Sequence, residues 1–148
     1  MGEPIKKKVR GMYEFRFKNK NRGYRKLNVW KKAIELYVIV SKNVYLIEGK
    51  PYKIINQLLG SAFSIHSNIA EGYCRRTLNE YLYHLNVALG SLGELGSGFI
   101  ACNQANQIDD KIFNQFNLIH YELENKLLKM IGSLQKKQLE GDWEDTFL

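Results

Sequence analysis

The sequence predicts an all-α protein, an antiparallel up-and-down four-helix bundle with an extended basic N-terminal arm. Four long segments repeat apolar side chains at intervals of three and four, turn-forming residues separate them, and strand-like alternation occurs only near the N-terminus. A chain of 148 residues with 45% apolar content suffices for one domain with a core. We expect an arm over residues 1–24, the bundle over 25–140 and a tail over 141–148.

The arm concentrates the positive charge of the chain. Residues 1–26 hold ten basic and two acidic side chains, a net +8, whereas the remainder sums to −1 out of a total of +7. Such asymmetry indicates a polyanionic partner, with RNA or DNA as the first candidate. The candidate nucleic-acid-binding residues are the ten cations of this stretch and two later arginines: Lys6, Lys7, Lys8, Arg10, Arg16, Lys18, Lys20, Arg22, Arg25, Lys26, Arg75 and Arg76.

Within the arm, Tyr13, Phe15 and Phe17 alternate with charged residues. This period of two is typical of an extended peptide. The rings could stack on bases, or they could dock the arm onto the bundle or a neighbouring subunit.

The first helix is expected from Leu27 to Leu46 and is apolar on more than one side. One face contains Leu27, Trp30, Ile34, Tyr37, Ser41 and Val44, and a second contains Val29, Leu36, Val38, Ile39 and Tyr45. A helix with two apolar faces is buried on two sides. We therefore expect subunit contacts through this helix.

The second helix is predicted from Pro51 to about Glu71. Gly72 falls where a left-handed residue would end it, and Thr77 with Glu80 forms a capping box for the next helix. On the small-residue face of this helix, Asn68 is expected to be a structural amide that bonds a neighbouring helix or the turn.

The third helix is expected from Leu78 to about Asn103, with Leu78, Leu82, Leu85, Leu89, Leu92 and Phe99 facing inward. It also contains Gly90, Gly93, Gly96 and Gly98, which imply a close helix crossing or a local break.

The fourth helix begins after an Asp109 cap, with Ile112, Phe116, Ile119, Leu123, Leu127, Met130 and Leu134 as its inner face. The acidic and aromatic tail that follows Gly141 could clip onto the bundle, pair with a basic arm, or present Trp143 and Phe147 to a partner. We expect packing within the assembly.

The segment Ser64–Thr77, together with Leu27–Ala33 and Gly90–Leu95, resembles a family of four-helix bundles encoded in ribosomal-RNA intervening sequences. That family also includes accessory (Avd-like) proteins of diversity-generating retroelements, and the likeness runs from about Tyr24 to Leu134. The resemblance implies a homo-oligomer, a pentamer in the best-characterised branch, which binds a reverse transcriptase and nucleic acid. The bundles are then expected to close into a ring through the first helix and the glycine-rich third helix.

Catalytic and metal-binding patterns are missing from the sequence. His66, His84 and His120 form no metal-ligand spacing and no nucleophile–base pair, so each is expected to be a polar residue on a helix flank. We expect no enzyme activity, no metal and no cofactor. The two cysteines and the lack of a long apolar run favour a cytoplasmic protein with no membrane contact.

Arg75 and Arg76 precede a helix N-terminus, where a cation is unfavourable, so an anion is expected nearby. That anion could be Glu71, Glu80 or a carboxylate of another subunit, or it could be a phosphate.

The sequence therefore favours a non-catalytic nucleic-acid-binding accessory protein. The alternatives are a structural assembly module without nucleic-acid affinity, in which the arm contacts acidic tails, and an RNA-processing enzyme that depends on His84 or His66.

Overall fold

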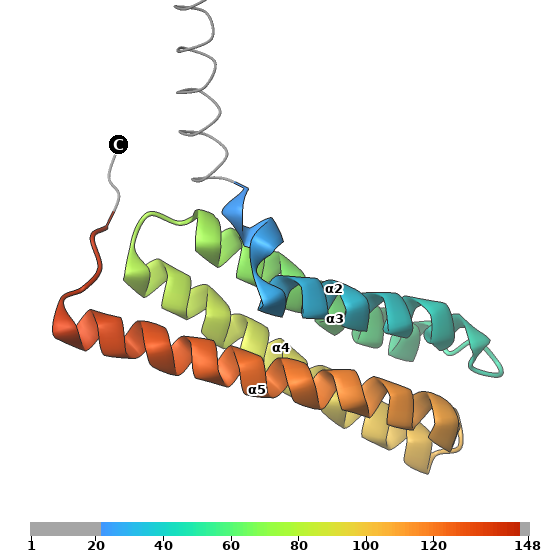
Figure 1. The fold of residues 1–148 in the computed structure, drawn as a ribbon. Coiled ribbons are helices and arrows are strands. Elements are labelled where there is room, and N and C mark those ends of the chain that lie inside the picture. The colour runs from blue at the N-terminus through green and yellow to red at the C-terminus, as the bar shows by residue number, and fades with distance from the viewer. Residues whose placement is uncertain (1–21, 146–148) are drawn as a thin grey trace, which may run out of the picture.

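The computed structural model describes residues 22–145, which form a four-helix bundle without strands (Figure 1). A short 3₁₀ helix η1 (Gly23–Lys26) precedes α2 (Asn28–Asn43), which continues as η2 (Val44–Leu46). Then come α3 (Tyr52–Cys74), α4 (Leu78–Gln104) and α5 (Asp110–Glu140). Successive helices are antiparallel and adjacent, and α5 closes the bundle against α2. The predicted all-α bundle is confirmed.

The helix boundaries follow local capping chemistry. The Asp109 carboxylate accepts the backbone N–H of Ile112 at 2.8 Å, and the Thr77 hydroxyl accepts that of Glu80 at 3.2 Å. At the far end of α5, Gly141 adopts φ 71°, a left-handed conformation that glycine adopts without strain. The Asp109 cap is confirmed. Of the predicted capping box, the Thr77 half is confirmed, whereas the Glu80 carboxylate accepts the Thr77 hydroxyl at 2.9 Å rather than a backbone N–H.

Gly72 does not end the second helix as predicted, because α3 runs on to Cys74. Gly72 lies where α3 crosses α4, and a Cβ there would be 2.8 Å from His84 Cβ and 3.1 Å from the Tyr81 carbonyl oxygen. This glycine is needed for close approach between helices rather than for a positive φ.

The glycines of α4 divide into two pairs within an unbroken helix. A Cβ on Gly96 would meet His120 at 2.8 Å, and one on Gly98 would meet Leu58 at 2.6 Å. Gly90 and Gly93 have nothing within 4 Å of such a Cβ. The close-crossing alternative therefore holds for two of the four, and no local break occurs.

The core face of α2 differs from the first predicted face. Val29, Ala33, Leu36 and Val40 are buried, whereas Trp30, Ile34 and Tyr37 are only half-buried. Both faces of this helix are apolar, so periodicity alone could not choose between them. The predicted inner faces of α4 and α5 are largely confirmed, with Ile131 taking the buried position expected for Met130.

Within residues 22–145, α4 alone has the length and composition of a membrane span. A buried core helix passes the same test, and nine residues of α4 are buried in the bundle.

Candidate functional site

Five of the predicted nucleic-acid-binding residues lie in the described part of the chain: Arg22, Arg25, Lys26, Arg75 and Arg76. The other seven lie outside the described residues: Lys6, Lys7, Lys8, Arg10, Arg16, Lys18 and Lys20. The three aromatic residues of the arm, Tyr13, Phe15 and Phe17, also lie outside them.

The short helix η1 fixes the start of the bundle beside the C-terminal end of α3. Gly23 lies so close to Tyr73 that a Cβ would be 2.0 Å from the phenol oxygen. The Tyr24 ring meets Trp30 edge-to-face at 5.4 Å between centroids, and the Arg25 guanidinium lies 5.9 Å from the Tyr24 centroid. The cations of η1 and the two arginines that follow α3 therefore share one end of the bundle (Figure 1).

Arg75 and Arg76 have different environments. Arg75 Nη2 donates to Glu71 Oε1 at 2.6 Å, one helical turn earlier, so the expected salt bridge is confirmed for this residue. Arg76 is exposed, and none of the side chains in residues 22–145 forms an ion pair with it.

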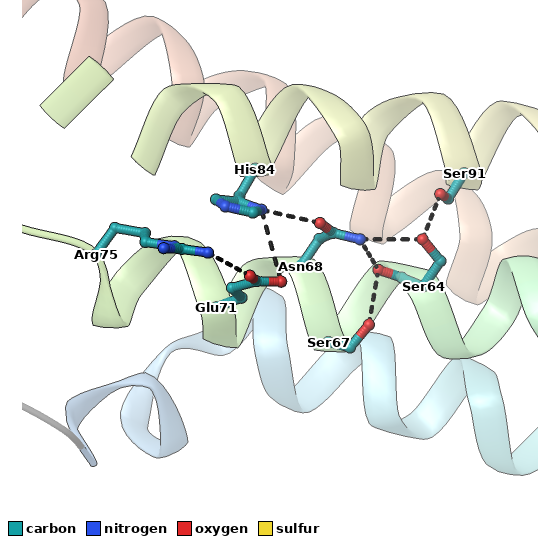
Figure 2. Close-up of polar contacts among 7 residues, drawn as sticks. All are labelled: Ser64, Ser67, Asn68, Glu71, Arg75, His84 and Ser91. Atoms are coloured by element: carbon teal, nitrogen blue, oxygen red, sulfur yellow. Dashed lines mark hydrogen bonds and ion pairs between the residues drawn. The ribbon is translucent and has the colours of Figure 1, made fainter. Parts of the chain in front are cut away.

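A row of polar side chains joins α3 to α4 and ends at Arg75 (Figure 2). We call it the polar row; its members are Ser91, Ser64, Asn68, His84, Glu71 and Arg75. The Ser64 and Ser91 hydroxyls are 2.8 Å apart, and Asn68 Nδ2 donates to the Ser64 carbonyl at 2.8 Å and to its hydroxyl at 3.0 Å. His84 Nδ1 lies 3.1 Å from Asn68 Oδ1 and 3.8 Å from Glu71 Oε2.

These contacts determine the tautomer of His84. Since the Asn68 amide nitrogen is engaged with Ser64, its oxygen faces the imidazole and can only accept, so Nδ1 of His84 carries a hydrogen. The prediction that Asn68 is a structural amide bonded to a neighbouring helix is confirmed. The sequence did not reveal its partner, because Asn68 and His84 come together only through the α3–α4 turn.

The other two histidines are also helix-flank residues. His120 Nε2 donates to the Leu92 carbonyl at 2.7 Å, and the His66 ring packs against Phe63 at 4.6 Å and Tyr37 at 5.6 Å. Partial burial lowers the pKa of His66. Among residues 22–145, no three His, Cys, Asp or Glu side chains are grouped to hold a metal ion.

An open groove continues from Ser64 and Ser91 along α3 and α4. It has a volume of about 400 Å³ and is lined by polar and small side chains that include Lys53, Gln57 and Glu94. Its lining combines one cation and one anion with neutral groups, so its charge favours neither phosphate nor metal.

The described part of the C-terminal tail folds back onto the N-terminus of α4. Asp145 Oδ1 accepts the backbone N–H of Leu78 at 2.8 Å, and the Trp143 ring lies 6.4 Å from that of Tyr81. Tail packing on the bundle, as the sequence predicted, is confirmed for these two residues. The acidic tail therefore lies at the same end of the bundle as η1 and Arg76.

Comparison with known proteins gives a family and a fold. Residues 25–131 match the model of the 23S rRNA-intervening sequence protein family. A crystal structure of a protein of unknown function from the S23 ribosomal protein family of Bacteroides thetaiotaomicron aligns with a TM-score of 0.65 and 23% identity, over 70% of this chain and 97% of that one. No curated protein matches the sequence significantly.

Proposed function

Because the chain belongs to the 23S rRNA-intervening sequence protein family, we propose that it is a non-catalytic, cytoplasmic, oligomeric protein that binds RNA or DNA. In this role it would resemble the retroelement accessory proteins that bind a reverse transcriptase together with nucleic acid. The reverse transcriptase would then supply the choice of target, because phosphate contacts from a basic arm carry little sequence information.

The observation that carries the proposal is the position of η1. It positions Arg25 and Lys26, the last cations of the +8 stretch, at the end of the bundle where Arg76 is exposed and unpaired within the described residues. The arm and the α3–α4 turn can therefore contact one polyanion together.

Assembly would multiply this effect. A homo-oligomer, with five copies as the resemblance implies, repeats the +8 stretch in every subunit. Several weak phosphate-binding arms on one particle bind a long nucleic acid far more tightly than one arm does.

The second candidate is an assembly module whose arm contacts other subunits. The tail favours it, because Asp142 and Glu144 are exposed at the same end as η1 and offer carboxylates to a basic arm.

The affinity for nucleic acid, measured as a function of salt concentration, separates the two candidate functions. We expect the full-length chain to bind a structured RNA and a matched DNA duplex with an affinity that falls steeply with salt. Substituting Lys6, Lys7, Lys8 and Arg10 by Gln should make the plot of log K against the logarithm of the salt concentration less steep by about 3. Each phosphate contact contributes about 0.7–0.9 to that slope.

The control variant neutralises Lys42, Lys50, Lys53 and Lys111, which are exposed at the opposite end of the bundle. It removes the same charge and should leave the slope unchanged. Equal slopes for both variants, or loss of the oligomer in the arm variant alone, would favour the assembly module.

A further inference from the structure

The chain reverses direction at the end of α5 through a defined turn. Gly141 has φ 71°, and its N–H donates to the Gln138 carbonyl oxygen at 3.4 Å. The Asp142 N–H donates to the Lys137 carbonyl oxygen at 3.0 Å. These two hydrogen bonds form a Schellman motif, which ends a helix and redirects the chain. Because α4 and α5 are antiparallel, the tail emerges beside the N-terminus of α4 (Figure 1).

Two contacts fasten the described part of the tail, residues 142–145, to α4; we call this segment the strap. Asp145 Oδ1 accepts the backbone N–H of Leu78 at 2.8 Å. That N–H belongs to the first turn of α4 and has no acceptor within the helix, and the helix dipole favours a carboxylate there. The Trp143 ring packs 6.4 Å from the buried ring of Tyr81 and is 38% exposed. The strap is therefore held by one charged hydrogen bond and one aromatic contact.

The strap brings negative charge to the end of the bundle that carries the cations. Its carboxylates are three: Asp142, Glu144 and Asp145. Asp145 is bound at Leu78, two positions after Arg76, and η1 with its cations packs against α3 at the same end. Charges act over about 8 Å at physiological ionic strength. Carboxylates fastened here therefore weaken the attraction between this end of the bundle and a phosphate, and a released strap can move them away.

We propose that the strap is autoinhibitory. While it is fastened, carboxylates of the chain itself lie where a nucleic-acid backbone would approach Arg76 and η1, and the backbone binds fully only after it displaces them. The inference rests on the proposed function, to which it adds a means of regulation. If only the open form binds fully, the observed affinity is reduced by the fraction of molecules in which the strap is open.

Trp143→Ala is the most direct test, because it unfastens the strap and leaves every charge in place. The affinity of the full-length chain for a structured RNA and for a DNA duplex should rise about three- to tenfold, the factor by which one aromatic pair shifts an equilibrium. Tyr52→Ala is the control and should leave the affinity unchanged. It removes a ring that is 66% exposed at the opposite end of the bundle.

A charge-matched pair of variants separates fastening from simple repulsion. Asp145→Ala and Asp142→Ala each remove one carboxylate from the strap, but only the first breaks the hydrogen bond to Leu78. We expect the gain in affinity from Asp145→Ala to exceed that from Asp142→Ala by about threefold, since the lost hydrogen bond releases the strap.

Trp143 also reports where the strap lies. In a Trp30→Phe background it is the single tryptophan of the chain. Its fluorescence emission should shift to longer wavelength when RNA is added, because the ring leaves Tyr81 for water. Adding Asp145→Ala to this background should produce the same shift without RNA.

Three results would overturn the inference and leave nucleic-acid binding in place: equal affinities of wild type and Trp143→Ala, equal gains from the two aspartate substitutions, or an unshifted Trp143 emission in the RNA complex. A lack of affinity in every variant would overturn the proposed function as well. Binding by Trp143→Ala but not by wild type would support both. Circular dichroism of each variant confirms that the bundle is folded.

Discussion

The contact between α3 and α4 differs from the contact between α2 and α5, although each joins two antiparallel neighbours. α3 and α4 approach closely at Gly72 and Gly98 and are joined by the half-buried hydrogen bonds of the polar row. α2 and α5 are bridged at their edge by Lys32, whose two carboxylate partners are about half exposed. Both contacts bury apolar side chains of one shared core; the first adds a close approach at glycines and hydrogen bonds between helices, and the second adds a solvent-exposed ion pair.

This difference separates substitutions that should cost stability from substitutions that should not. The α3–α4 contact uses its small residues internally, so substitutions there should cost stability. The outward sides of α2 and α5 are largely charged or polar and expose single apolar side chains such as Val38 and Leu128, so substitutions there should leave the fold intact. Three substitutions, at Gly72, Asn68 and Lys32, test this comparison and follow in order of their expected effect on stability.

The largest effect is expected at the α3–α4 crossing. Gly72→Val places a branched side chain where a Cβ alone would be 2.8 Å from His84 Cβ. We expect a loss of about 3 kcal/mol in the free energy of unfolding, at the upper end of the cost of overpacking. Urea denaturation followed by circular dichroism measures it.

Gly93→Ala is the matched control, because Gly93 is in a helix interior with open space around it. This change should stabilise the protein, by up to about 1 kcal/mol. A neutral Gly72→Val would show that α3 and α4 can separate without cost.

The sequence predicted most of the fold because amphipathic period and capping residues act locally. The Thr77 and Asp109 caps and the inner face of α5 each depend on residues within one helix. The role of Gly72 could not be predicted, because the same residue type serves a left-handed helix end and a close crossing, and only the position of α4 decides between them. Likewise, Glu71 and Arg75 lie one helical turn apart and form an ion pair only because α3 continues past Gly72.

The candidate site was predicted less fully. Charge asymmetry identified the cationic residues, but their convergence at one end of the bundle depends on η1 packing against Tyr73. The polar row depends on contacts between helices, such as that of Asn68 with His84, which no local spacing encodes.

An intermediate effect is expected inside the polar row. Asn68→Ala leaves the Nδ1 hydrogen of His84 without its acceptor and removes the donor to Ser64. We expect a loss of about 2 kcal/mol, the cost of unmade hydrogen bonds at a half-buried site. Gln115→Ala, on the exposed side of α5, is the control and should change stability by less than about 0.5 kcal/mol. If the two substitutions have the same effect, water replaces Asn68 without loss.

The smallest effect is expected at the α2–α5 edge. Hydrogen bonds from Lys32 lower the pKa of Glu122, and those to Glu122 and Glu35 raise the pKa of Lys32. A carboxyl whose folded pKa is lowered contributes stability above its ordinary pKa and loses it as the pH falls through the folded value. The Lys32 contribution is present below the ordinary lysine pKa and is lost as the pH rises through its raised value.

Lys32→Gln should therefore lower the melting temperature slightly at neutral pH. The difference from wild type should vanish in strong acid and in high salt, because the pair is exposed and screened. A difference that persists under both conditions would mean that the aliphatic stem of Lys32, rather than its charge, holds α2 to α5.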